Sequence, residues 1–391
     1  MQSSSAVVVG NHTQGLGIVR SAGVAGYTVW MLNEAVVCLG RFSKYLAGYR
    51  RVRHGTFARL DQAQGAEHLL QQLLELPVEY PAVLFPVNED VNVFIYSHRE
   101  QLRAKYVIPD TRIDLITDKY QFNGLLPDSA QVETWLWSEW DAQRVTASDR
   151  FILKGRQGTR FRQITGRKAL PLDRLAQTQI DRLQASMATA QVIVQRIVET
   201  DRPVLSVCSL AVDGQIQRLF QYEKIRQHPD RFGTGTYLRS TRVDSVIPLA
   251  AQILYSLHYT GISEIECMFD SATRTYKVLE MNPRTWKSVH FATQCEQNLV
   301  AHYLAYTATG QIVRGEDYTL GCYWADLSTD LPQMVRERRP FSYTPGFFEC
   351  IWDWADPLPA VALGTFFPLM CLERLYGKFA RRNGAWEANR Y

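Results

Sequence analysis

Two glutamates and one asparagine carry the clearest chemical signal in this chain of 391 residues. Glu266 and Glu280 stand on either side of a short polar stretch, and Asn282 follows two residues later. Folding the chain back around Thr273 places Glu266 directly opposite Glu280. Two facing carboxylates repel each other, so this pairing predicts a cation between them. Carboxylate and amide oxygens suit Mg²⁺ or Mn²⁺, and Mg²⁺ often shares its coordination shell with phosphates.

The segments that must position these side chains read as a hairpin of two short strands. Residues 263–269 alternate apolar and acidic side chains, residues 270–273 favour a turn, and residues 276–281 form the returning strand. The same register places Glu264 near Asn282. The alternative is a solvated acidic face, since a slip of one residue would send the two glutamates to opposite faces.

The sequence Ile-Glu-Cys-Met-Phe-Asp at residues 265–270 precedes Val-Leu-Glu-Met-Asn-Pro-Arg at residues 278–284. This pattern resembles the metal-binding end of the ATP-grasp carboxylate–amine ligases, in which an acid, a turn and Leu-Glu-x-Asn-Pro-Arg follow one another. The resemblance implies ATP and Mg²⁺ or Mn²⁺ as cofactors, and it assigns a phosphate contact to Arg284. The metal ligands that it implies are Glu266, Glu280 and Asn282.

Two lysines upstream fall at positions where this family contacts the phosphates of ATP. Thr117 or Asp118 predicts the cap of a helix that begins near Lys119. An apolar strand is predicted to end in Lys154. The resemblance makes both lysines phosphate contacts and makes residues 155–165 a mobile loop over the phosphates. Without the resemblance, a lysine in a first helical turn would usually face solvent.

Residues 191–198 predict a further strand. ATP-grasp proteins hold the adenine beside such a segment through main-chain groups, and the residue after it is placed to reach the ribose. The other nucleotide-binding residues implied by the resemblance are therefore Gln195, Arg196, Ile197, Val198 and Glu199.

A basic segment covers residues 222–242 and includes Lys224 and Arg226. By resemblance it borders the acceptor end of the cleft, with Arg284 and Lys287 nearby, and substrate contacts are expected at Lys287 and Ser288. Arginine binds a carboxylate through two parallel hydrogen bonds, so the segment favours an amino acid or a similar small anion as one substrate. The alternative is that these cations simply face water.

The N-terminal stretch predicts a βαβ unit. Residues 6–9 and 27–32 read as parallel strands on either side of a helix that begins near Ile18. The glycines of residues 10–17 complete neither nucleotide-binding pattern. The Lys-Ser/Thr of a P-loop is missing, and Arg20 replaces the third glycine of a dinucleotide-binding fingerprint. These glycines therefore indicate a tight strand-to-helix turn.

Residues 82–86 predict another strand of the same sheet. Asn88, Glu89 and Asp90 follow its carboxyl end, where open parallel sheets bind ligands. They are candidates for substrate contacts or for helix caps. This half of the chain resembles the small α/β domain that precedes the ATP-grasp module.

The length of the chain allows two or three packed units. The expected fold class combines α/β and α+β: a Rossmann-like domain, a two-subdomain ATP-grasp fold and a C-terminal extension. The expected boundaries are 1–114 for the first domain, 115–198 for the lid subdomain, 199–310 for the subdomain with the metal site and 311–391 for the extension.

Composition excludes several other classes. The net charge is only +4 and no dense basic stripe is present, so nucleic-acid binding is not expected. Seven scattered cysteines without a C-x-x-C pair indicate reduced thiols. The sequence suggests neither a signal peptide nor a membrane span. We therefore expect a cytoplasmic protein with small-molecule partners, and a homodimer remains open.

The resemblance implies an ATP-dependent ligase. ATP would phosphorylate a carboxylate, and an amine would displace phosphate from the acyl phosphate, which leaves an amide, ADP and phosphate. An alternative from a different class is a catalytically silent ATP-binding or sensory module on the same fold. A nicotinamide-dependent oxidoreductase is disfavoured because the glycine fingerprint is incomplete.

Overall fold

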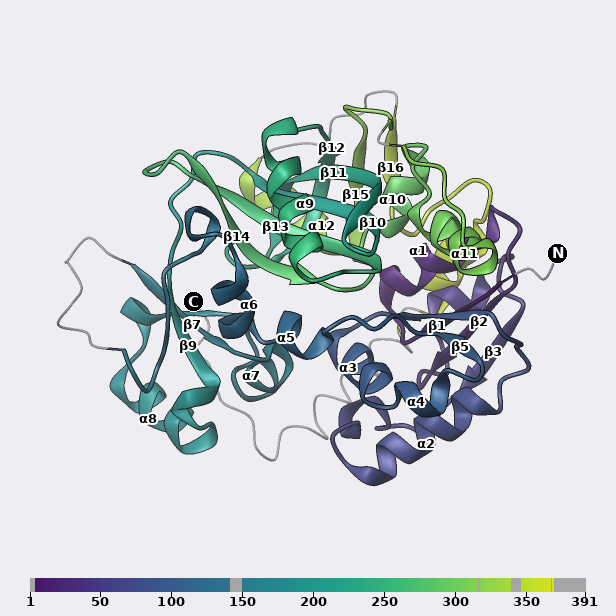
Figure 1. Cartoon of the computed structure of the whole chain (residues 1–391), viewed down its shortest axis with the longest axis horizontal. Coiled ribbons are helices and arrows are strands. Elements are labelled where there is room, and N and C mark those ends of the chain that lie inside the picture. The colour runs from purple at the N-terminus through teal and green to yellow at the C-terminus, as the bar shows by residue number, and fades with distance from the viewer. Residues whose placement is uncertain (1–3, 141–149, 316, 339–345, 367, 369–391) are drawn as a thin grey trace.

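A computed structural model describes residues 4–140, 150–315, 317–338, 346–366 and 368 of the chain. Three sheets organise these residues (Figure 1). A parallel sheet from the N-terminal region and a small antiparallel sheet lie at opposite ends of the long axis. The largest sheet lies above and between them, and the acidic hairpin forms its edge.

The N-terminal sheet has five strands in the order β3-β2-β1-β4-β5, and all neighbours run parallel. Its strands are β1 (Ser5–Val9), β2 (Val29–Asn33), β3 (Gly48–Arg51), β4 (Ala82–Pro86) and β5 (Tyr106–Val107). Its helices are α1 (His12–Gly23), α2 (Ala63–Leu74), α3 (Glu89–Ser97) and α4 (Arg99–Leu102). The predicted parallel α/β architecture is confirmed, and the apolar runs of β1 and β4 are buried because both strands are central.

One detail of this region differs from the prediction. Helix α1 begins at His12 and not near Ile18, so most of the glycine-containing stretch is helical. Gly10, with φ of +118°, makes the turn from β1. Gly17 has a different use: a Cβ there would lie 3.2 Å from Val289, so glycine lets α1 pack closely against the segment that follows the acidic hairpin.

The residues expected to form the lid subdomain, called the lid below, contain an antiparallel sheet in the order β6-β9-β7-β8. Its strands are β6 (Thr134–Leu136), β7 (Phe151–Gly155), β8 (Leu170–Pro171) and β9 (Val192–Arg196). Its helices are α7 (Gly158–Thr165) and α8 (Gln177–Ser186), and α5 (Ile113–Thr117) and α6 (Lys119–Leu125) lead into it. The prediction of a mobile loop at residues 155–165 is wrong, because most of this segment forms α7, which the fully buried Phe161 anchors.

The large sheet has seven strands in the order β14-β13-β10-β11-β12-β15-β16. Its strands are β10 (Val204–Val212), β11 (Gln215–His228), β12 (Thr234–Ser240), β13 (Gly261–Asp270), β14 (Thr275–Asn282), β15 (Tyr323–Ala325) and β16 (Phe347–Glu349). Its helices are α9 (Ile247–Ser256), α10 (Val289–Gln294), α11 (Leu299–Thr309) and α12 (Leu327–Glu337). Strands β10 and β11 form the hairpin that their Asp213-Gly214 turn favours.

The segment after residue 310 is part of this sheet. Strand β15 pairs with β12, and β16 pairs with β15, so the expected boundary at residue 310 divides a sheet instead of separating two units. Arg20 of α1 anchors the segment further. Its buried guanidinium binds the carboxylate of Asp356 at 3.0 Å and three backbone carbonyl oxygens of the same segment.

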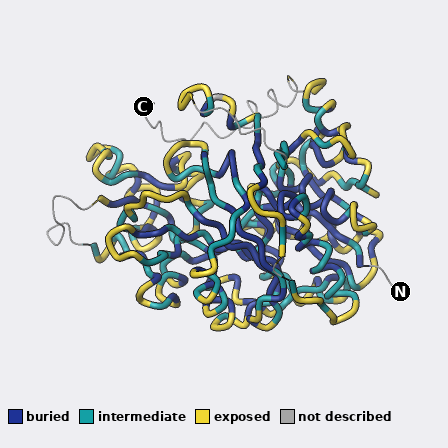
Figure 2. The backbone as a smooth tube through the Cα atoms, turned by 90° about the horizontal axis from the view of Figure 1, so that it is seen from above, coloured by how far each residue is buried: buried dark blue, intermediate teal, exposed yellow. Residues whose placement is uncertain are grey.

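The main core joins the N-terminal sheet to the large sheet. A single cluster of buried apolar residues includes Val8 of β1, Leu16 of α1, Phe220 of β11 and Phe291 of α10. Figure 2 shows this buried backbone in dark blue, with exposed loops around the rim. The lid has a separate, smaller core around Phe151. Among the described residues, none of the helices combines the length and the apolar composition that crossing a membrane requires.

Candidate active site

The acidic hairpin forms with the predicted pairing of its functional side chains. Glu266 is the partner of Glu280, and Glu264 is the partner of Asn282. Closer to the turn the register shifts by one residue, because Leu279 is an additional residue in β14. A hairpin centred on Thr273 therefore predicts the pairing of the glutamates correctly, but it gives the wrong pairing for the residues closer to the turn.

The bulge at Leu279 decides which way Glu280 points. Val278, just before the bulge, is 1% exposed and belongs to the core, whereas Glu280 lines a pocket. Residues two apart in a regular strand point to the same face. The additional residue therefore lets an apolar side chain face the core while the carboxylate faces the opposite side.

Lysines from two other segments contact the hairpin. Lys224 Nζ, on β11, lies 2.6 Å from Glu266 Oε1, and Lys119 Nζ, at the start of α6, lies 3.9 Å from Glu280 Oε2. Both ammonium groups are mostly shielded from solvent, so these contacts are stronger than exposed ion pairs.

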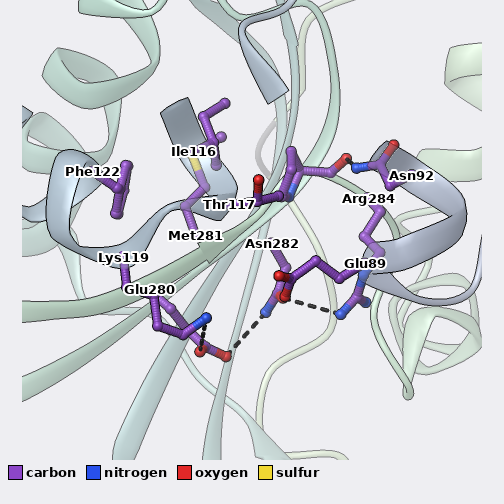
Figure 3. Close-up of a pocket in the computed structure, with 11 residues that line it drawn as sticks. Glu89, Asn92, Ile116, Thr117, Lys119, Phe122, Glu280, Met281, Asn282 and Arg284 are labelled. Atoms are coloured by element: carbon purple, nitrogen blue, oxygen red, sulfur yellow. Dashed lines mark hydrogen bonds and ion pairs between the residues drawn. The ribbon is translucent and has the colours of Figure 1, made fainter. Parts of the chain in front are cut away.

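Asn282 connects the two carboxylates to an arginine. Its Nδ2 donates to Glu264 Oε2 at 3.0 Å and to Glu280 Oε1 at 3.5 Å, and its Oδ1 accepts from Arg284 Nη2 at 3.1 Å. Figure 3 shows Lys119 and Arg284 approaching Glu280 and Asn282 from different sides. The residues drawn there line a pocket with about 360 Å³ of empty space.

The start of α6 fixes the position of Lys119. The Asp118 carboxylate accepts from the backbone N–H groups of residues 120 and 121, so the predicted helix cap is confirmed. The same carboxylate binds the Arg156 guanidinium at 2.5 Å, and Lys119 N donates to Arg156 O at 2.9 Å. The lid is thereby joined to the helix that carries Lys119.

Helix α7 begins at the same pocket. The Gly158 N–H donates to Glu89 Oε1 at 3.4 Å, and a Cβ on Gly158 would lie 3.5 Å from Lys119 Nζ. Glu89 lines the pocket as expected, while Asn88 caps α3 by accepting from the Val91 N–H at 2.9 Å. Of the three polar residues after β4, one is thus a pocket residue and one a cap.

The lysines keep Glu280 ionised. Burial alone would raise its pKa, but Lys119, Lys168 and Lys154 outweigh burial and lower that pKa to about 2. Glu264 behaves in the opposite way, since burial and then the neighbouring Glu266 raise its pKa. The hairpin therefore combines one strongly acidic carboxylate with one that holds a proton more readily.

The Lys154 ammonium group loses its proton more readily than a lysine exposed to water. Burial lowers its pKa to about 8, against the opposing attraction of Glu280. Its Nζ donates to Gln195 Oε1 at 2.8 Å, and Gln195 in turn donates to Thr134 Oγ1 at 3.0 Å. The Gln195 side chain thus orients a lysine, a role that the prediction of main-chain adenine contacts did not include.

The segment expected to hold adenine has few free main-chain donors. The N–H of Arg196 donates to Glu133 O and the N–H of Ile197 donates to Arg150 O. The N–H of Val198 has no hydrogen-bond partner among the described residues. Glu199 is exposed and pairs with Arg150 at 2.8 Å.

Arg226 lies apart from this pocket. Its guanidinium binds both oxygens of Asp330 on α12: Nε lies 3.1 Å from Oδ1, and Nη2 lies 2.6 Å from Oδ2. It also stacks 4.3 Å from the Tyr237 ring centroid. Both partners of the ion pair are almost fully buried. A direct substrate contact through Arg226 is therefore wrong for this conformation, because its carboxylate-binding face already holds Asp330.

Ser288 and Lys287 also differ from simple substrate contacts. Ser288 is 2% exposed, and its hydroxyl has no hydrogen-bond partner among the described residues. Lys287 Nζ lies 2.6 Å from Asp326 Oδ2. Neither residue lines the pocket of Figure 3.

Two features escaped the sequence analysis. Lys168 lowers the pKa of Glu280 but follows a segment that was expected to be a loop. Asp326, Glu349 and Cys350 bring ligand atoms within 4.8 Å of one another. The Glu349 oxygens there accept backbone N–H groups, including that of Ile351 at 2.7 Å, which gives this cluster a structural use.

The hairpin side chains fit a hard divalent cation. Glu266 and Glu280 are direct partners across the strands, and Asn282 adjoins Glu280. A half-turn of the Asn282 amide would present its oxygen to the carboxylates in place of Nδ2. Two carboxylates and an amide leave positions for phosphate oxygens and water, as Mg²⁺ requires.

Comparison with known proteins supports the fold through structure alone. No protein-family model matches the chain, and no curated protein matches it. N5-carboxyaminoimidazole synthetase from Staphylococcus aureus, complexed with ADP, superimposes with a TM-score of 0.62 at 17% identity, over 86% of this chain and 85% of that one.

Two further solved structures give the same result. The L-amino acid ligase from Bacillus licheniformis has a TM-score of 0.56 at 11% identity, over 79% and 75% of the chains. The biotin carboxylase domain of Hydrogenobacter thermophilus 2-oxoglutarate carboxylase, a dimer with MgADP, has a TM-score of 0.60 at 13% identity, over 83% of this chain and 74% of that one. The chain thus has the ATP-grasp fold, and the predicted fold class is confirmed.

Proposed function

We propose that this protein is an ATP-dependent carboxylate–amine ligase that releases ADP and phosphate. The observation that carries the proposal is the pair Glu266 and Glu280, opposite each other and contacted by the lysines Lys224 and Lys119. Structural neighbours that were crystallised with ADP or MgADP support the choice of nucleotide.

The cations have a clear use in this reaction. A phosphoryl group and a carboxylate repel each other, so positive charge must surround both before the bond can form. Lys119, Lys154 and Arg284 would supply it, and the backbone N–H groups at the start of α7 would add to it. When bound, Mg²⁺ would neutralise phosphate charge from Glu266, Glu280 and Asn282.

The base and sugar of the nucleotide have fewer candidate contacts. The free N–H of Val198 is the main-chain donor for adenine. Gln195 would act through Lys154, while Arg196 and Ile197 contribute carbonyl oxygens. Glu199 would reach the ribose after leaving Arg150.

The substrates we propose are a small carboxylate and a small amine, at least one of them an amino acid or a similar anion. Lys224 is a cation of the basic segment that contacts the acidic hairpin, through Glu266. Ser288, with its unpartnered hydroxyl, is available to a substrate only after a local rearrangement. A homodimer is part of the proposal.

The test is ADP release by the purified protein with ATP, Mg²⁺ and a panel of acids and amines. We expect release that depends on both additions and is lost about 100-fold or more in Glu280→Ala. The exposed Glu67→Ala is the matched control and should keep full activity. Tight ATP binding without release from any pair would indicate the silent module, and AMP as the stoichiometric product would refute the mechanism.

A further inference from the structure

A second cavity adjoins the pocket of Figure 3. It holds about 640 Å³ of empty space, part of it open to solvent, at the junction of β4, the chain before α5, the start of β13 and α11. Most of its lining is aliphatic or aromatic. Its apolar lining includes Phe85, Ile95, Ile108, Ile262 and Tyr303. A cavity with mainly apolar walls and few polar groups is typical of small-molecule sites.

One wall is common to the two cavities. Asn92, Pro283 and Arg284 line both of them, so a molecule in the second cavity reaches the residues that face Glu280. The Asn92 side chain donates to Pro283 O at 3.0 Å, which joins α3 to the acidic hairpin at this wall.

Arg284 is the only charged side chain among the described residues that line the second cavity. Its guanidinium donates to two neutral oxygens, Asn282 Oδ1 at 3.1 Å and Thr285 O at 2.8 Å. It has no ion pair with any described residue. A positive charge at the end of an apolar cavity selects an anion with an apolar body.

Tyr303 supplies an independent observation. It is 6% exposed and packs edge-on against Phe85, and its hydroxyl has no hydrogen-bond partner among the described residues. Tyr259 lines the same cavity but donates its hydroxyl to Ile262 O at 2.8 Å. This hydroxyl is not among the fully buried side-chain atoms that lack a partner, so it opens onto the cavity and can donate a hydrogen bond to a ligand there.

We propose that the second cavity binds the carboxylate substrate, which has an aromatic or branched aliphatic body. The carboxylate would lie at Arg284, facing Lys119 and the phosphates, and the apolar body would lie against Ile108 and Phe85. This inference rests on the proposed ligase function and adds the chemical class of one substrate.

The test is calorimetric titration of the protein, without nucleotide, with phenylacetate, acetate and phenylacetamide. Phenylacetate should bind about tenfold or more tightly than either of the others, because acetate lacks the apolar body and the amide lacks the charge. Ile108→Trp, which fills the cavity, should weaken phenylacetate binding by about tenfold. Val24→Trp, at an exposed position, is the matched control and should change nothing.

A second variant keeps the test decisive if Ile108→Trp does not fold. Ile108→Ala enlarges the cavity and should shift the preference from phenylacetate towards 1-naphthylacetate. Equal affinity for phenylacetate and acetate, or affinities unchanged by both substitutions at Ile108, would overturn the inference. Because no nucleotide is present, that outcome leaves the ligase function to the ADP assay. Saturable phenylacetate binding without ADP release from any pair would instead refute the ligase function.

Discussion

The protonation state of Lys154 should make nucleotide binding depend on pH in a range where the other pocket lysines do not titrate. Burial lowers the Lys154 pKa to about 8. For Lys119 and Lys224 burial acts in the same direction, but Glu89 and Glu280 for the first, and Glu266 for the second, outweigh it and raise the pKa. Raising the pH through 8 therefore removes one positive charge that would face the phosphates.

The size of the effect follows from that pKa. If ATP binds only the form with protonated Lys154, the apparent dissociation constant of ATP is multiplied by 1 + 10^(pH − pKa). Affinity should fall about twofold at pH 8 and about tenfold at pH 9 relative to pH 7. Lys154→Arg keeps its charge over this range, so its affinity should not change with pH.

The measurement is equilibrium binding of ATP with Mg²⁺ at pH 7, 8 and 9, which requires no turnover and no knowledge of the substrates. Lys154→Met should bind weakly at every pH. Two results would refute the reasoning: a wild-type affinity that stays constant from pH 7 to 9, or a Lys154→Arg variant that loses affinity as the wild type does.

Stability, metal, substrate and core predictions complete the set. Between pH 8 and 10.5 the folded chain binds fewer protons at Lys154 than the unfolded chain, so the stability of the wild type rises with pH in this range. Urea unfolding should therefore show Lys154→Met to be roughly 3 kcal/mol more stable than wild type at pH 7 and equal to it near pH 10.5. Glu280→Ala should lose turnover and Mg²⁺ dependence but keep its circular dichroism spectrum; near-normal activity would disprove the metal assignment. Lys224→Ala should raise KM for the amino-acid substrate more than KM for ATP, and equal changes would argue against its substrate role. Asp330→Ala should cost about 3–5 kcal/mol of unfolding free energy because it removes the buried carboxylate that faces the Arg226 guanidinium, and a loss below 1 kcal/mol would contradict this.

The acidic hairpin was predictable because its information is local. The alternation of side chains and a polar turn predicted that Glu266 lies opposite Glu280. Asp118, as a helix cap, predicted the helix that begins at Lys119. The error in the turn is also local. A bulge at Leu279 has no side-chain signature, and only the burial of Val278 reveals why the strand needs it.

Other features depend on packing between distant segments and were therefore beyond the sequence. Arg226 reads as a surface cation until α12, more than a hundred residues later, brings Asp330 against it. The resemblance predicted a loop where helix α7 forms, and Phe161, buried in the lid core, holds this helix in place. The second cavity arises where several separate segments meet, and none of them marks it alone.

The contact between Arg20 and Asp356 has a consequence for how the chain is made. The two residues are 336 positions apart, and both are almost fully buried. A ribosome therefore releases the first helix long before the carboxylate that neutralises it exists. Until then the guanidinium must remain hydrated, because burying it alone is costly. We expect the first sheet to stay loosely packed during synthesis and to close only when nearly the whole chain has emerged.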